Sequence, residues 1–159
     1  MFSENQSEFS NFHIKFMFEA FKLAEKAFEE GEIPVGAVVV HENKIVGKGY
    51  NQVQMLKDPT AHAEMLAISA ACSTLQNKYL NNCTLYVTLE PCHMCAGALV
   101  WSKIDRIVFG AMDEKSGSCG TKLNIASNRT LNHSIEIIQG IMEADSKYLL
   151  QQFFKQKRT

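Results

Sequence analysis

The chain alternates between stretches of helix-like and strand-like hydrophobic spacing. Between residues 12 and 30, apolar side chains recur at three- and four-residue steps, and Gly31 follows as a helix stop. Residues 35–41 and 44–50 are rich in β-forming side chains and are separated only by Glu42 and Asn43, the length of a tight hairpin connection. This pattern predicts an amphipathic first helix followed by two antiparallel strands.

The rest of the chain continues this alternation. Asp58-Pro59-Thr60 offers a helix start ahead of a helical run over about residues 61–75. Residues 84–89 have the pattern of a buried strand, and Glu90-Pro91 turns that strand directly into a helix over residues 92–101. Two further strands are predicted over 106–110 and 134–138, with a loop over 113–120 between them and a final helix over about 142–155.

These elements predict a single α/β domain over residues 1–159. Helices that alternate with strands cover both faces of one sheet, so three layers in the order α/β/α are expected. The opening hairpin makes the five-stranded sheet a mixed one. Residues 1–11 precede the first pattern and are expected to be a loose N-terminus, and residues 142–159 are expected to form a C-terminal helix with a basic tail.

Composition supports a globular protein and excludes several classes. Hydrophobic residues make up 46% and charged residues 21% of the chain, which argues against disorder. The apolar stretches are far shorter than the ~20 residues of a membrane span, and the N-terminus lacks a signal pattern, so a cytoplasmic location is expected. The net charge of -1 means that any affinity for nucleic acid must be local. Five cysteines without a small-protein framework favour metal binding or burial over disulfides.

Three residues have the types and spacing of metal ligands. Cys92 and Cys95 are three positions apart, so they share a face in the first turn of a predicted helix, where the backbone N–H groups favour the thiolate form. His62 occupies the start of the preceding predicted helix, so it can supply a third ligand. Three protein ligands leave one tetrahedral position for water, which is typical of catalytic rather than structural zinc.

Glu64 has the position of a proton carrier beside such a metal. It lies two residues after His62, too close to ligate the same ion comfortably, yet able to reach a bound water. Water on zinc has a pKa near 7 instead of ~15.7, and a general acid–base adds roughly a hundred- to ten-thousand-fold in rate. The sequence therefore predicts hydrolytic chemistry with Glu64 as the catalytic residue.

The motif His62-Ala63-Glu64 with Pro91-Cys92-His93-Met94-Cys95 resembles the known signature of the zinc nucleobase deaminases. The segments 33–38, 58–64, 88–92, 94–98 and 109–111, with Asp113 beyond them, are similar to the bacterial tRNA-specific adenosine deaminases of the cytidine/deoxycytidylate deaminase superfamily. Similarity continues through Asn132-His133 and Phe153-Phe154, so it covers nearly the whole chain.

The resemblance implies a fold, a reaction and further site residues. It implies the cytidine-deaminase fold, one zinc ion per chain, a homodimer, and conversion of the wobble adenosine in a tRNA anticodon loop to inosine. It also implies that Asn51 hydrogen-bonds the purine and that the backbone around Ala63 and Cys92 holds the base and the reacting oxygen. Asp113 is expected near the RNA strand, where its carboxylate can accept a bond from a ribose 2′-hydroxyl.

Two rival functions use the same residues. A deaminase of a free base or nucleoside, of the guanine or cytosine type, would use the same metal chemistry with different pocket walls. A non-catalytic RNA-binding subunit would keep zinc only for folding, but Glu64 and the unfilled fourth ligand position argue against it.

The remaining candidate residues have simpler explanations. Cys72 and Cys83 are expected to be buried apolar side chains, and His13, His41 and His133 to have surface or capping roles. His93 is expected to point away from the face that Cys92 and Cys95 share. The basic tail of Lys155, Lys157 and Arg158 is either a solvated helix end or a phosphate contact.

Overall fold

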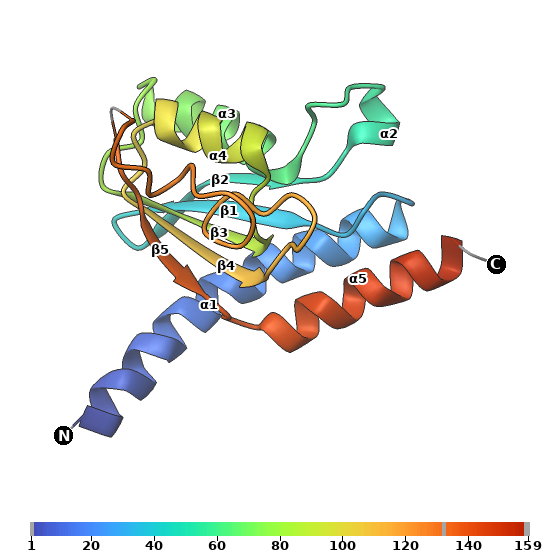
Figure 1. Ribbon diagram of the computed structural model, residues 1–159, viewed down its shortest axis with the longest axis horizontal. Coiled ribbons are helices and arrows are strands. Elements are labelled where there is room, and N and C mark those ends of the chain that lie inside the picture. Colours follow the sequence, from blue (N-terminus) through green and yellow to red (C-terminus); the bar gives the residue numbers. More distant parts are fainter. Residues whose placement is uncertain (1, 132, 158–159) are drawn as a thin grey trace.

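The computed structural model describes residues 2–131 and 133–157 and shows five strands and five helices among them (Figure 1). In chain order the elements are α1 (Phe2–Glu29), β1 (Gly36–His41), β2 (Lys44–Tyr50), α2 (Val53–Leu56), α3 (Ala63–Leu75), β3 (Cys83–Leu89), α4 (His93–Trp101), β4 (Arg106–Ala111), β5 (Glu136–Gln139) and α5 (Glu143–Lys157).

The sheet is mixed, as the sequence predicts. Its strand order is β2-β1-β3-β4-β5, with β1 antiparallel to both β2 and β3, and with β3, β4 and β5 parallel. Glu42 and Asn43 close the β1–β2 hairpin with positive φ angles of 49° and 62°, the signature of a type I′ turn. The hairpin therefore accounts for the antiparallel β1–β2 pair at one edge of the mixed sheet.

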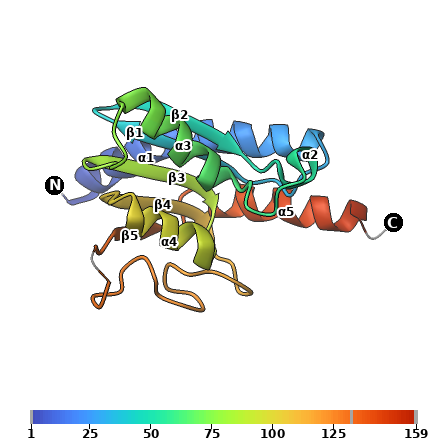
Figure 2. The same ribbon diagram turned by 90° about the horizontal axis from the view of Figure 1, so that it is seen from above.

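Helices cover both faces of the sheet and create two hydrophobic cores. Helices α1 and α5 lie on one face, and α3 and α4 lie side by side on the other (Figures 1 and 2). The first face packs Phe16 and Met17 of α1 against Tyr86 and Val108. On the second face, alanines of α3 and Leu99 of α4 meet the opposite side of the same strands. The predicted three-layer α/β/α architecture is confirmed.

Gly49 brings the first turn of α3 onto the sheet. A Cβ atom built at Gly49 would lie 2.3 Å from the carbonyl oxygen of Ala63 and 2.7 Å from the amide nitrogen of Ala67, which no side chain tolerates. Only glycine lets the helix backbone approach this closely. Because Ala63 is the first residue of α3, this contact also fixes the start of the helix, where His62 lies.

Two predictions about local structure are wrong, and one element was not predicted. Residues 2–11 are not loose, because α1 already begins at Phe2. The short helix α2 was not predicted, since four residues are too few to show a helical period. His13 is fully buried rather than at the surface: its Nδ1 lies 2.7 Å from the hydroxyl oxygen of Tyr86 beneath the sheet. A long-range partner of this kind leaves no trace in local spacing.

Among the described residues, no helix combines the length and the apolar character needed to cross a membrane. Asn132 and Arg158, both named in the sequence analysis, lie outside the described residues.

Candidate metal centre

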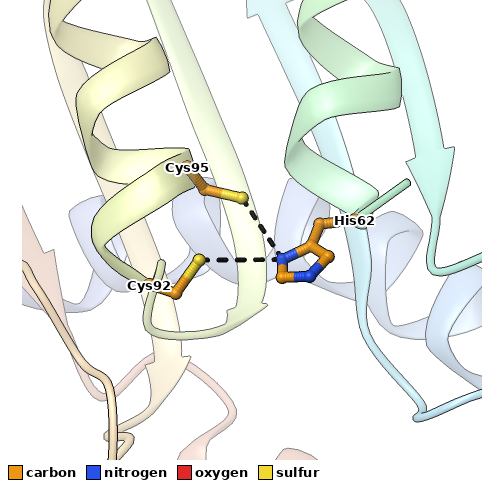
Figure 3. A group of neighbouring side chains, drawn as sticks. All are labelled: His62, Cys92 and Cys95. Atoms are coloured by element: carbon orange, nitrogen blue, oxygen red, sulfur yellow. Dashed lines mark hydrogen bonds between the residues drawn. The ribbon is translucent and has the colours of Figure 1, made fainter. Parts of the chain in front are cut away.

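The predicted metal ligands come from the starts of two helices that lie side by side. His62 is the residue immediately before α3 and Cys92 the residue immediately before α4, and both have extended backbone conformations. Cys95 follows in the first turn of α4. Helices α3 and α4 pack on the same face of the sheet, so their first turns bring the three side chains together (Figure 3).

The distances among these side chains fit a tetrahedral metal ion. The Nδ1 atom of His62 lies 3.7 Å from Sγ of Cys92 and 3.5 Å from Sγ of Cys95, and all three ligand atoms lie within 4.8 Å of one another. Zinc bonds of ~2.0 Å to nitrogen and ~2.3 Å to sulfur at tetrahedral angles need N–S separations of about 3.5 Å. One nitrogen and two sulfurs are also the donors that zinc prefers.

Hydrogen bonds prepare one of the two sulfurs as an anion. The bond from the Cys95 thiol, followed by the bond with His62, lowers the pKa of Cys92 to about 3. The same bond and burial raise the pKa of Cys95, and the bond to Cys92 raises the pKa of His62. These shifts favour the thiolate form of Cys92, the form in which cysteine binds a metal.

Glu64 lies in the first turn of α3 and is almost completely buried, with 4% of its surface exposed. Burial raises the pKa of its carboxyl group to about 7, and the negative charge of Cys92 adds to this effect. A group with a pKa near neutrality can accept a proton and return it at the same pH. This property suits a proton carrier.

A pocket of about 200 Å³ opens beside the three ligands. Its walls include His62, Cys92, Ala63, Glu64, Asn51 and Asp113, so the structure brings six of the seven predicted site residues to one cavity. The seventh, Cys95, is fully buried and completes the ligand set. His93 is exposed and does not belong to that set, as predicted.

Asn51 offers the pocket an unused hydrogen-bond acceptor. Its side-chain NH2 group donates to the carbonyl oxygen of Ile33 over 3.3 Å, and its backbone N–H donates to the carbonyl oxygen of Val35 over 3.1 Å. The side-chain oxygen is buried and has no hydrogen-bond partner within residues 2–131 and 133–157. A buried acceptor of this kind is costly unless a ligand supplies a donor.

Asp113 reaches the pocket from the loop after β4 but is tied into that loop. Its carboxylate accepts bonds from the amides of Lys115 and Ser116, at 3.0 and 3.3 Å, and from the Ser116 hydroxyl at 2.9 Å. The predicted contact with a ribose hydroxyl stays a prediction.

Sequence reasoning missed five residues of the pocket wall, namely Ile33, Val35, Leu89, Glu90 and Ser116. The first four flank strand ends near recognised motifs, a signal that could have marked them. Ser116 lies in a loop of no regular pattern and gave no such signal.

Comparisons with known proteins show which proteins this chain resembles. A family model described as the cytidine and deoxycytidylate deaminase zinc-binding region matches residues 10–111. The tRNA-specific adenosine deaminase of Aquifex aeolicus is 50% identical over 143 residues, which cover 90% of this chain and 94% of that protein. The tRNA-specific adenosine deaminase of Bacillus subtilis is 44% identical over 143 residues, covering 90% and 89%.

A solved structure also has the same fold. It comes from studies of A-to-I editing by tRNA:A34 deaminases at the wobble position of transfer RNA. Its chain superposes with a TM-score of 0.82 at 37% sequence identity, over 85% of this chain and 98% of that one.

Proposed function

The chain belongs to the cytidine and deoxycytidylate deaminase zinc-binding family, and from this premise we propose that it hydrolyses the wobble adenosine of a tRNA anticodon loop to inosine. The protein is a deaminase with zinc as its cofactor. The observation that carries the proposal is the His62, Cys92 and Cys95 cluster beside buried Glu64, inside a chain that matches tRNA-specific adenosine deaminases over nine-tenths of its length.

We assign His62, Cys92 and Cys95 as the ligands of one zinc ion per chain. The N–S separations of 3.5 and 3.7 Å support this assignment, as does the thiolate character of Cys92. Bound zinc supplies an activated water at the fourth ligand position.

Glu64 moves the protons of the reaction. The net change is adenosine plus water to inosine plus ammonia, so the C6–N bond breaks and a C6–O bond forms. Glu64 takes a proton from the attacking water, delivers it to N1 of the purine, and then transfers the second water proton to the leaving amine. Its buried position and its pKa of about 7 support both directions of transfer.

The pocket walls hold the base. Asn51 has a free buried acceptor that fits a donor group of the purine, and Ala63, the first residue of α3, lines the same cavity. Asp113 lies at the outer loop, where we propose that it contacts the ribose of the RNA strand. An adenosine in an anticodon loop reaches such a pocket by flipping out, at lower cost than from a duplex.

We further propose that the protein is a single domain, that it forms a homodimer and that it acts in the cytoplasm. Trp101 supports the dimer, because its large apolar side chain is 80% exposed at the end of α4. Five free thiols and a tRNA substrate suit a reducing compartment.

Mass analysis of an anticodon stem-loop after incubation with the zinc-loaded protein tests the function. We expect conversion of the wobble adenosine to inosine, and no ammonia release from free adenosine, guanine or cytidine. Release from a free base with no change in the stem-loop would instead establish the rival free-base function.

A further inference from the structure

Glu90 is a buried carboxylate that the mechanism does not use. It lies between β3 and α4, two residues before Cys92, and only 2% of its surface is exposed. A buried charge is costly unless it is fully hydrogen-bonded. The partners of Glu90 therefore indicate what it does.

Four hydrogen-bond donors of one loop approach the Glu90 carboxylate. One oxygen accepts from the amide of Asp113, at 3.2 Å, and from the hydroxyl of Thr121. The other accepts from the amides of Cys119 and Thr121, at 3.0 and 3.2 Å. Four donors match the acceptor capacity of an ionised carboxylate, and a neutral amide would turn an NH2 group toward two of them.

The loop is also shaped to pack against this carboxylate. A Cβ atom at Gly117 would lie 2.5 Å from Cδ of Glu90 and 2.4 Å from the carbonyl oxygen of Asp113, so the position requires glycine. The amide of Ser118 donates to the carbonyl oxygen of Pro91 over 2.9 Å. The loop is therefore attached to the turn that presents Cys92.

The same loop forms one wall of the substrate pocket. Asp113 and Ser116 line the cavity beside His62, and the Asp113 carboxylate holds Ser116 by two bonds. Residues 113–118 contain no helix or strand, so hydrogen bonds such as those to Glu90 and Pro91 hold this wall in place.

We propose that Glu90 is a positioning residue that sets the affinity for the RNA substrate by anchoring loop 113–121, through Asp113 and Ser116 and not by contact with the reacting atoms. This inference rests on the proposed function, because it names the wall that receives the RNA. The zinc ligands and Glu64 lie at the starts of α3 and α4, outside residues 113–121, so loosening the loop acts on binding more than on chemistry.

Three variants weaken the anchor in different ways. Glu90→Gln removes one acceptor, Gly117→Ala pushes the loop away from an unchanged carboxylate, and Thr121→Val removes only the hydroxyl donor. Glu42→Gln is the matched control, since it makes the same charge change at a side chain that is 83% exposed in the β1–β2 turn.

The first measurement is amide hydrogen exchange in zinc-loaded protein. We expect exchange at Cys119 and Thr121 to rise about tenfold or more in Glu90→Gln and Gly117→Ala, to rise less in Thr121→Val, and to stay unchanged in Glu42→Gln. Unchanged exchange in all three loop variants would overturn the anchoring role.

The second measurement is the split between KM and kcat with the anticodon stem-loop. We expect KM to rise about fivefold or more in Glu90→Gln and Gly117→Ala, with kcat within about twofold and zinc content unchanged. If Glu90→Gln does not fold, KM and kcat are compared in Gly117→Ala and Thr121→Val instead. An unchanged KM in a variant whose loop has lost protection would refute the proposal, as would a fall in kcat alone.

The proposed function can fail separately. If the wild-type protein does not deaminate the stem-loop, that function is wrong, while hydrogen exchange still decides whether Glu90 anchors the loop.

Discussion

The Nδ1 atom of His62 lies 3.5 Å from Sγ of Cys95, although 33 residues separate the two in the chain. The contact exists because α3 and α4 pack side by side and both begin at the same end of the strands. In the chain, β3 connects the two helices. Each helix start contributes backbone N–H groups that have no carbonyl acceptor within the helix, and these groups favour anionic ligands. Zinc binding therefore depends on the relative position of the two helices.

Replacing a ligand should remove the metal. We expect Cys92→Ser to lose zinc and turnover together, because a serine hydroxyl is not ionised at neutral pH. Zinc raises the melting temperature of a protein that binds it only in the folded state, so added zinc should stabilise the wild type. It should not stabilise Cys92→Ser. Metal analysis and a thermal scan measure both effects. The control is Cys72→Ser, a half-buried cysteine outside the ligand group, which should keep its zinc; zinc-replete Cys92→Ser would contradict the assignment.

Glu64 should be separable from metal binding. We expect Glu64→Gln to retain one zinc ion per chain and to lose about a hundred- to ten-thousand-fold or more in kcat, because the amide cannot carry protons. Single-turnover kinetics with the anticodon stem-loop, alongside metal analysis, make the comparison. Turnover within about tenfold of the wild type would show that another group carries the protons.

The parts of the site that sequence could predict are those built from neighbours in the chain. Cys92 and Cys95 share one helical turn, and Glu64 lies within the first turn that follows His62. Helix spacing and helix starts decide such relations locally. The strand and helix order also predicted the mixed sheet and its covered faces, because short connections limit the possible topologies.

The parts that sequence could not predict depend on distant partners. The donors to Glu90 lie 23 to 31 residues beyond it, in a loop without periodicity. His13 sits on a helix whose pattern shows one apolar face, but its partner Tyr86 is 73 residues away. Polar residues with such partners look exposed in the sequence, since only the folded chain supplies their hydrogen bonds.

His13 should make the protein sensitive to mild acid. Burial lowers its pKa, whereas in the unfolded chain it titrates near ~6.5. The unfolded state thus binds more protons below that pH, so the stability from neutral His13 is complete above pH ~6.5 and is lost as the pH falls toward the folded-state pKa.

Urea unfolding of zinc-loaded protein at several pH values measures this loss. We expect the free energy of unfolding to fall between pH ~7.5 and ~5.5, and to fall less in His13→Gln. His41→Gln, at a partly exposed histidine, should keep the wild-type dependence. An identical decrease in His13→Gln and wild type would assign the acid sensitivity to other groups.

Asn51 should contribute to binding rather than to chemistry. Its unpaired buried oxygen gains a partner only when a ligand enters, so we expect Asn51→Ala to raise KM about tenfold, in line with one lost hydrogen bond. Zinc content should not change. Steady-state kinetics compare it with Asn81→Ala, an exposed asparagine in the α3–β3 connection. A normal KM in Asn51→Ala would remove Asn51 from the substrate site.

The basic end of α5 should bind RNA phosphate. Lys157 lines a hollow of about 460 Å³ together with Asn51 and His62, so its charge lies beside the entrance to the metal site. Each phosphate contact adds about 0.7 to 0.9 to the slope of log affinity against log salt. We therefore expect deletion of residues 155–159 to weaken binding of the stem-loop and to reduce that slope by about one or more, with zinc content unchanged.

The double variant Lys44→Ala and Lys78→Ala removes two exposed charges elsewhere and should bind normally. Equal affinity and slope in the truncated protein would make the tail a solvated helix end, because losing a phosphate contact must reduce the salt dependence of binding.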